Sequence, residues 1–346
     1  MRPAQARIDL KALQHNFNRV RTAAPNSKVM AVVKANAYGH GLVPVAQALN
    51  CADALAVVCL EEAISLREAG FGKRIVLLEG PFEAEDLALV HGYRLDMVIH
   101  HESQLDLLER GQPLRSPDIW LKLDTGMHRL GFAPAQFGDV QKRLKQLQKP
   151  GEIRCMTHFA CADEPDSPVT RQQLASFDDA CDAFEGERSL ANSAGVLAWP
   201  AAHADWVRPG IMLYGSSPFS ETSAESLGLQ PVMTLSTRLI AVNRHRKGEA
   251  IGYGGEWTCP EDMPVGVAAI GYGDGYPRHA PSGMPVLVNG KRTALAGRVS
   301  MDMICIDLRS QPDARVGDEV TLWGAGLPVD EVASQAGTIG YELLCG

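Results

Sequence analysis

The feature that most limits the possible folds is an alternation of short apolar runs with helix-like segments between residues 30 and 215. The runs have the length and composition of buried strands. They fall at Val29–Val33, Ala54–Val58, Ile75–Glu79, Met97–His100, Ile119–Asp124, Arg154–Phe159, Ser189–Ser193 and Val207–Tyr214. Alternating strands and helices predict a parallel sheet with both faces covered. Eight strands favour an N-terminal (β/α)8 TIM-type barrel. A doubly wound sheet is the rival, but it lacks the glycine-rich turn expected after its first strand.

Three of the intervening segments carry clear helix signals. Leu60–Gly70 has acidic residues in its first turn, apolar residues at helical spacing, and a glycine where the helix should stop. Ala135–Leu147 and Val169–Phe184 follow the same pattern. We therefore expect helices over these ranges.

The pattern changes near Gly215. Residues 216–226 are polar and rich in serine, which is typical of a linker. The remainder predicts strands, with a hairpin turn at Asn289-Gly290 and one short helix over Val329–Ala336. The expected strands are Thr234–Val242, Val265–Ile270, Pro285–Val288, Ala294–Val299, Met303–Leu308 and Glu319–Trp323. The prediction is a barrel domain over residues 1–225 and an all-β domain over 226–346. Whether the first residues join the β-domain is left open.

Composition excludes several classes of protein. A net charge of −8 argues against nucleic acid or an acidic membrane as the main partner. Eight cysteines without a C-x-x-C pair indicate reduced thiols rather than a disulfide or zinc framework. His100 and His101 point to opposite faces of a strand, so no metal site is expected. The first residues lack the apolar core of a signal peptide, and no apolar run reaches the length of a membrane helix. These features predict a cytoplasmic protein.

A lysine stands at the carboxyl end of the first apolar run. Lys34 follows Val29–Val33 directly, and Gly39 and Gly41 mark the loop that comes next. Partial burial lowers the pKa of a lysine and frees a nucleophilic amine. On this spacing alone, a surface lysine that closes a strand is the simpler interpretation.

Active sites of (β/α)8 barrels lie at the carboxyl ends of the strands. The polar side chains expected there are those of Lys34, Tyr38, Lys122, Arg129, His158, Asn192, Ser193 and Arg208, and Gly210 and Ile211 can offer backbone N–H groups. The loops after strands seven and eight usually bind phosphate, and the Ser193 hydroxyl with the backbone N–H groups of Gly210 and Ile211 suits that role. A turn followed by a helix cap would explain the same residues. A phosphate site opposite a strand-end lysine favours pyridoxal 5′-phosphate (PLP) as cofactor.

Three motifs in order resemble the alanine racemase family: Lys34–Gly41, Arg208–Gly215 and Ile251–Gly255. The resemblance runs from near Ile8 to Tyr341. It implies a PLP-dependent racemase that interconverts L-alanine and D-alanine. It also implies a head-to-tail homodimer, because the family counterpart of Tyr253 reaches into the barrel of the partner.

The resemblance assigns a role to each candidate. Lys34 holds PLP as an aldimine and then serves as the base on one face of the substrate, while Tyr253 serves the other face. The side chains implied to bind the cofactor are Tyr38, His158, Asn192, Ser193, Arg208 and Tyr341, with the backbone of Gly210 and Ile211. His158 is expected to form a hydrogen bond with Arg208 and to help orient it. With Arg208 and Arg129, it is also expected to give Tyr253 a cationic setting.

Arg208 bears on the type of reaction, because its family counterpart faces the pyridine nitrogen of PLP. Arginine stays protonated and can only donate a hydrogen bond, so the ring nitrogen stays largely unprotonated. This weakens the ring as an electron sink and favours proton transfer at Cα over transamination and decarboxylation. A salt bridge ahead of a Pro-Gly turn would also explain an arginine here.

The substrate side of the site is implied in the same way. Family motifs that bind the substrate or line the entrance to the active site are matched by Arg129, Tyr272, Met301 and Asp302. Lys122 matches a lysine that is often carbamylated in the family. The chain departs from the family pattern at Asn36, Ser300 and Gly340.

Two other functions stay open at this point, a racemase of broader specificity and a non-catalytic PLP-binding protein. A decarboxylase of related fold is disfavoured by Arg208. The sequence does not distinguish a biosynthetic from a catabolic role.

Overall fold

The computed structural model describes residues 2–111, 117–147 and 151–346. The chain forms two compact units. One comprises Gln14–Leu213 and Pro218–Thr222, and the other comprises Met1–Leu13, Tyr214–Ser217 and Ser223–Gly346. Helix α1 (Leu10–Ala23) starts in the second of these units and continues into the first. The domain boundary expected after residue 225 stays a prediction.

The first unit contains a closed barrel of eight parallel strands in sequence order. These are β2 (Lys28–Val32), β3 (Ala54–Val57), β4 (Arg74–Leu77), β5 (Asp96–Ile99), β6 (Ile119–Lys122), β7 (Ile153–Met156), β8 (Arg188–Ser189) and β9 (Trp206–Val207). The ring closes where Lys28 and Val29 pair with Trp206 and Val207. The predicted (β/α)8 barrel is confirmed. Its apolar runs are buried on both faces, as helix-covered parallel strands must be.

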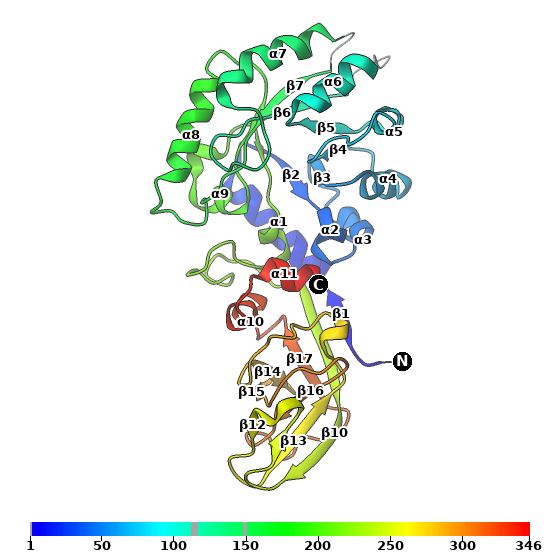
Figure 1. Cartoon of the computed structure of the whole chain (residues 1–346), viewed down its shortest axis with the longest axis vertical. Helices are drawn as coiled ribbons and strands as arrows, with labels where there is room; N and C mark the ends of the chain where they lie inside the picture. Colours follow the sequence, from blue (N-terminus) through cyan, green and yellow to red (C-terminus); the bar gives the residue numbers. More distant parts are fainter. Residues whose placement is uncertain (1, 112–116, 148–150) are drawn as a thin grey trace. The chain divides into compact units, whose positions relative to one another are not determined.

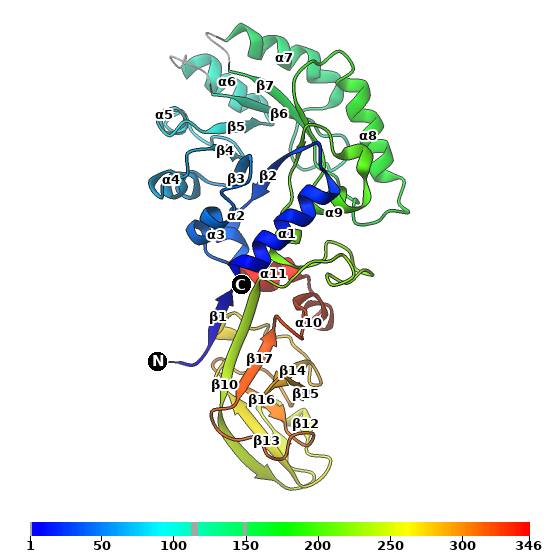
Figure 2. The same ribbon diagram turned by 180° about the vertical axis from the view of Figure 1, so that it is seen from behind.

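Helices cover the outside of this barrel, as Figures 1 and 2 show from opposite sides. They are α3 (Leu42–Ala48), α4 (Leu60–Glu68), α5 (Asp86–Gly92), α6 (Glu102–Gly111), α7 (Phe137–Gln146) and α8 (Val169–Ala180). The helix predicted from Leu60 is confirmed, and it ends just before Gly70, whose φ is 87°. The other two predicted helices are α7 and α8, each a few residues shorter than expected.

The last two barrel strands were predicted too long. At residues 193–198 the chain forms helix α9 (Ser193–Ala198), because the Asn192 side chain caps it by accepting a hydrogen bond from Gly195 N. Residues Ile211–Tyr214 form a 3-10 turn after Pro209 and Gly210 rather than continuing a strand. The two loops that result lie at the carboxyl end of the barrel.

The second unit is built on a closed antiparallel sheet in the order β1-β10-β13-β16-β15-β14-β17, in which β10 also pairs with β17. Its strands are β1 (Gln5–Ile8), β10 (Met233–His245), β13 (Met263–Ala268), β14 (Pro285–Val288), β15 (Lys291–Leu295), β16 (Ile304–Asp307) and β17 (Glu319–Trp323). The first residues join this sheet, since Gln5 pairs with Ser236. The predicted hairpin is confirmed, with Asn289 and Gly290 both at positive φ between β14 and β15.

Two helices complete this unit. The predicted helix at residue 329 is α10 (Val329–Gln335), and a further helix that sequence analysis missed, α11 (Gly340–Cys345), follows it. Within the described ranges, no helix has both the length and the apolar character needed to cross a bilayer.

Candidate active site

Lys34 is followed by a turn of unusual handedness. The strand β2 ends at Val32, and the half-buried Lys34 comes just after it. Residues Ala35–Tyr38 all have φ between 52° and 55°, which is the left-handed region. Each such residue costs about 1–2 kcal/mol for a side chain other than glycine. Backbone strain of this kind persists only where the surroundings fix it, and it concentrates at functional sites.

The left-handed turn places Tyr38 against Gly210. A Cβ atom added at Gly210 would lie 2.5 Å from the Tyr38 hydroxyl oxygen, so a larger residue there would displace the Tyr38 side chain. Gly210 N donates a 2.9 Å hydrogen bond to Ser193 Oγ, and Met212 N donates a longer one of 3.4 Å. The structure therefore brings Tyr38, Ser193 and Gly210 together, with the buried Ile211 beside them.

This group has the chemistry that a phosphate requires. Ser193 Oγ accepts two backbone N–H bonds, so its own hydrogen is left to donate to an anion. The Tyr38 hydroxyl is a further neutral donor. Neutral donors at the ends of loops are a sound anchor for phosphate. Asn192 contributes indirectly, because its side-chain oxygen is engaged in capping α9.

Arg208 is 4% exposed and is held from two strands. Its Nη1 donates to Ser189 Oγ at 2.6 Å, and its Nη2 donates to the carbonyl oxygens of Thr157 (2.5 Å) and Leu190 (3.2 Å). Burial lowers the pKa of Arg208 to about 10, so the guanidinium stays protonated near neutral pH. Nε makes no hydrogen bond within residues 2–111, 117–147 and 151–346, and it can donate to a ring nitrogen.

The predicted hydrogen bond between His158 and Arg208 is wrong. The partners of Arg208 are a serine hydroxyl and two carbonyl oxygens, as given above. Burial and the nearby cations Arg208, Lys122, Arg129 and Lys34 lower the pKa of His158 to about 3. The imidazole is therefore neutral at physiological pH and cannot supply the positive charge expected of it.

Lys122 ends β6 and is 9% exposed. Burial, followed by the positive charges of Arg208 and Arg129, lowers its pKa to about 8. The loop after it returns to the strand, because Phe132 N donates to Lys122 O at 2.9 Å. Asp124 Oδ1 holds this loop by accepting from Gly126 N and His128 N. Arg129 is consequently presented at the surface of the loop.

Sequence analysis missed Gln173 of α8, which is 1% exposed. Its amide donates to His158 O at 3.0 Å and to Thr125 Oγ1 at 3.4 Å, and it accepts from Ala160 N at 2.9 Å. It therefore ties together the loops that follow β6 and β7. A signal existed in the sequence, because Gln173 shares the buried face of α8 with Thr170 and Phe177 at helical spacing.

The other unit gathers a second group of predicted residues. Tyr272 N donates to Ser300 O at 3.0 Å, and Gly273 N donates to Met301 O at 2.9 Å. A Cβ at Gly271 would lie 2.3 Å from Ser300 O, so the two segments touch through bare backbone. Tyr272 and Met301 are therefore neighbours, and both side chains are exposed.

Arg2 forms ion pairs with both of these segments, the one that follows Gly271 and the one that follows Ser300. Its guanidinium pairs with Asp302 at 3.2 Å and with Asp274 at 2.8 Å. The Asp302 carboxylate is thus already engaged with a cation of its own unit.

Tyr253 and Tyr341 are the remaining candidates. Tyr253 is 69% exposed, in the loop between β11 (Ala250–Ile251) and β12 (Trp257–Thr258). Tyr341 lies in α11. The preceding Gly340 departs from the family pattern for a reason visible here, since a Cβ there would lie 2.5 Å from Ser216 Oγ.

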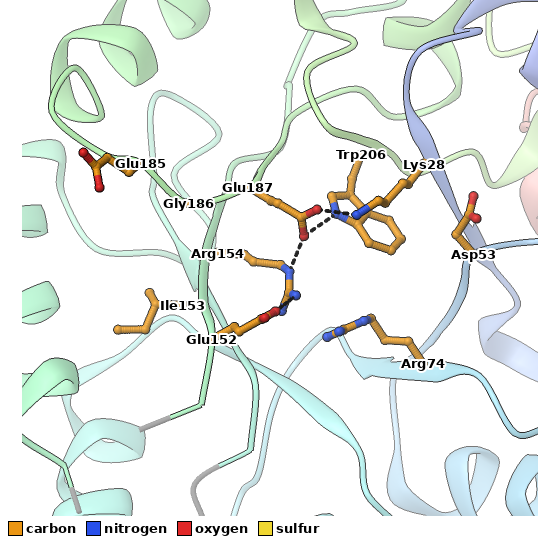
Figure 3. Close-up of a pocket in the computed structure, with 10 residues that line it drawn as sticks. All are labelled: Lys28, Asp53, Arg74, Glu152, Ile153, Arg154, Glu185, Gly186, Glu187 and Trp206. Carbon is orange, nitrogen blue, oxygen red and sulfur yellow. Dashed lines mark hydrogen bonds and ion pairs between the residues drawn. The ribbon is translucent and has the colours of Figure 1, made fainter. Parts of the chain in front are cut away.

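A cavity of about 800 Å³ opens at the other end of the barrel (Figure 3). Lys28, Arg74 and Trp206, which line it, are first residues of strands β2, β4 and β9, so it lies at the amino ends, away from Lys34. Arg154 pairs with Glu187 at 2.6 Å, with Asp118 at 3.3 Å and with Glu152, and Lys28 pairs with Glu187 at 2.5 Å. Cations and carboxylates neutralise one another here. We interpret the cluster as structural, as is usual at this end of the fold.

This cluster predicts a pH dependence of stability. Burial alone would raise the pKa of Glu187, but hydrogen bonds from Lys28, Arg154 and Trp206 outweigh it and lower the pKa from 4.5 to about 2. A depressed carboxyl pKa stabilises the fold fully above pH ~4.5 and loses that contribution as the pH falls towards ~2. We expect Glu187→Gln to lower the free energy of unfolding by about 2–4 kcal/mol at neutral pH.

Urea unfolding at neutral pH and near pH 3 checks this. The difference between the wild type and Glu187→Gln should shrink at the lower pH. Glu185→Gln is the matched control, because Glu185 lines the same cavity but makes no ion pair within the described part of the chain. A gap that stays constant with pH would show that Glu187 acts through packing and not through its charge.

Known proteins are similar to this chain over nearly its whole length. The model of the family described as "Alanine racemase, N-terminal domain" matches residues 8–218, and "Alanine racemase, C-terminal domain" matches residues 232–346. The chain is 52% identical over 346 residues to an alanine racemase of Halorhodospira halophila, covering 99% of this chain and 95% of that one. It is 53% identical over 345 residues to an alanine racemase of Vibrio cholerae, covering 99% and 96%.

Solved structures are similar as well. The crystal structure of biosynthetic alanine racemase from Pseudomonas aeruginosa has a TM-score of 0.97 and 51% identity, covering 100% of this chain and 97% of that one. Alanine racemase from Acinetobacter baumannii has a TM-score of 0.94 and 41% identity, with coverages of 100% and 97%.

Proposed function

This chain belongs to the alanine racemase family, and we propose that it interconverts L-alanine and D-alanine by proton transfer at Cα between Lys34 and Tyr253. It is an isomerase. The observation that best supports the assignment of residues is the strained turn directly after Lys34, which carries Tyr38 against Gly210, whose N–H is bonded to Ser193. The non-catalytic alternative is not retained, because full-length similarity to racemases extends through both units.

The residues at the carboxyl end of the barrel fit pyridoxal phosphate, the cofactor of this family. When bound, the cofactor supplies a conjugated ring that withdraws electrons from Cα and makes its hydrogen acidic. Ser193, Tyr38 and the backbone at Gly210 and Ile211 would hold the phosphate. Lys34 would hold the cofactor covalently.

Arg208 would limit the reaction to proton transfer. Its guanidinium is protonated, and three hydrogen bonds to Ser189, Thr157 and Leu190 fix its orientation. A protonated guanidinium can donate a hydrogen bond to the ring nitrogen of a bound cofactor but cannot accept a proton from it and does not give up its own near neutral pH, so Arg208 would leave a bound ring only a moderate electron sink. His158 stays neutral and leaves the positive charge to Arg208 and Arg129.

Inversion at Cα requires one proton donor and one acceptor on opposite faces of a flat carbon. Lys34 is proposed for one face and Tyr253 for the other. Tyr253, Tyr272 and Met301 are exposed in their own unit, although such side chains usually pack. We propose that a second copy of the chain covers them, so that each site combines Lys34 and Arg129 of one subunit with Tyr253 of its partner.

A chiral assay tests the function. Purified protein loaded with PLP should convert L-alanine to an equal mixture of both enantiomers, and D-alanine to the same mixture. Serine and lysine, assayed in parallel, test the alternative of broader specificity. Failure to form D-alanine, with the cofactor spectroscopically bound, would contradict the proposal.

Lys122 is proposed to be carbamylated. Its lowered pKa of about 8 increases the neutral fraction of the amine, which is the form that adds carbon dioxide. The product carries a negative charge in a cluster of cations, where it would be stabilised and could orient Arg129. With isotope-labelled bicarbonate, we expect one carbamate resonance by NMR that Lys122→Gln abolishes. A resonance that survives this substitution, or none in the wild type, would rule the modification out.

A further inference from the structure

Tyr253 sits at the tip of a very short hairpin. Strands β11 and β12 pair through only Ala250 with Thr258 and Ile251 with Trp257. The base of the hairpin is anchored, because Ile251 and Cys259 pack in a small apolar cluster with Met263. These packing contacts stop at Ile251, where the loop begins.

The loop itself has little to hold it. Gly252, Gly254 and Gly255 have φ of 74°, 76° and 59°, a conformation that glycine adopts freely and leaves as freely. Within the loop, Gly255 N donates a backbone hydrogen bond to Gly252 O at 3.3 Å. The Tyr253 side chain is exposed and gains no fixed position from packing within its own unit. A base that transfers one particular proton at Cα must have a better-defined position than these features alone provide.

Arg298 supplies that restraint. Its Nε donates to Glu256 Oε2 at 2.6 Å, and its Nη2 pairs with Oε1 of the same carboxylate. This two-pronged geometry fixes orientation as well as distance. Glu256 closes the loop, and the guanidinium also lies along it, since a Cβ at Gly254 would be 3.4 Å from Arg298 Nη1.

The segment that carries Arg298 is itself firmly placed. Ala296 N donates to Cys305 O at 2.9 Å, and Gly297 N donates to Ser282 Oγ at 3.0 Å. A Cβ at Gly297 would lie 2.7 Å from Ile251 O, so this backbone packs directly on the hairpin. Arg298 therefore starts from a well-fixed backbone between β15 and β16, and its guanidinium contacts the loop that carries Tyr253.

We propose that Arg298 and Glu256 are positioning residues that set the location of the Tyr253 hydroxyl. The inference rests on the proposed function of Tyr253. Both side chains are partly exposed, so their ion pair adds little to the stability of the whole fold. Its effect falls on catalysis, because a displacement of about 1 Å in a catalytic group can reduce a rate by up to about 100-fold.

The test uses primary isotope effects measured with Cα-deuterated L-alanine and D-alanine separately, on the PLP-loaded enzyme. Arg298→Gln and Glu256→Gln should lower kcat by about 10- to 100-fold. They should also raise the isotope effect for one enantiomer only, the same one that Tyr253→Phe affects. The melting temperature should stay close to that of the wild type. Arg292→Gln is the matched control, because Arg292 of β15 forms a similar partly exposed pair with Glu331 of α10 in the same unit, and it should change neither isotope effect.

The charge-exchanged double variant Glu256→Arg with Arg298→Glu should recover most of the lost rate. Without recovery, Arg298 and Glu256 act independently and the proposed pair is wrong. Isotope effects that rise equally for both enantiomers, or not at all, in Arg298→Gln would also overturn the inference. If Tyr253→Phe itself shows no preference between enantiomers, the assignment of Tyr253 as a base fails instead.

Discussion

Lys34→Ala is expected to abolish racemisation, with a fall in kcat of at least about 10³-fold, since it removes the cofactor attachment and one of the two proton-transfer groups together. The visible absorbance of the lysine-bound cofactor should disappear from the purified variant. Both readouts depend on the amine at the carboxyl end of β2 and not on the fold, so far-ultraviolet circular dichroism should be unchanged.

The matched control is Lys142→Ala on α7, an exposed lysine whose ion pair is with Asp139. It should retain activity and absorbance. If the visible band persisted in Lys34→Ala, another lysine would hold the cofactor, and Lys122 would be the first to examine. The strained turn over Ala35–Tyr38 would then lack a functional explanation.

Tyr253→Phe is expected to lower racemisation by about 10²- to 10⁴-fold, the usual contribution of one acid–base group. The substitution removes one oxygen atom and keeps the ring. In deuterated water, exchange of the Cα hydrogen should continue from the enantiomer that Lys34 deprotonates and should nearly stop from the other. Equal and mild effects on both enantiomers would count against a mechanism with two bases.

Mixing the two inactive variants tests whether sites are shared. In a twofold dimer with composite sites, a Lys34→Ala subunit paired with a Tyr253→Phe subunit has one intact site and one doubly defective site. After dissociation and random reassociation, about one quarter of wild-type activity should return. If each site were built within one chain, no pairing would hold an intact site and no activity would return.

The structural features that could be predicted have their causes within short stretches of the chain. The barrel was predictable, because buried strands and their helices leave a periodic signal within a few residues of each other. The placement of Lys34, Lys122 and His158 at strand ends followed from the same signal. Asn289-Gly290 predicted its hairpin for a similar reason, since both residues tolerate positive φ. The last two barrel strands were predicted too long, because a helix cap at Asn192 and a turn after Pro209 and Gly210 end them early.

The details of the site were not predictable in this way. The partners of Arg208 lie on strands far from it in the sequence, and the hydrogen bond expected from His158 goes instead to the Thr157 and Leu190 carbonyl oxygens and to Ser189. The neutrality of His158 depends on burial near four cations that lie at the ends of three different strands. Gln173 could be recognised as a link between two loops only once α8 was seen to cover them.

The amino-acid sequence was sufficient to predict the architecture, the positions of the chemically active residues along the chain and the family to which the chain belongs. These depend on periodicity and on short motifs, which are properties of neighbouring residues. The charge states of the groups, the hydrogen bonds that hold Arg208, the strained left-handed turn after Lys34 and the contact of Arg298 with the Tyr253 loop became visible only in the folded structure. Those properties depend on burial and on contacts between distant segments, and electrostatic interactions are strong only where folding has excluded water.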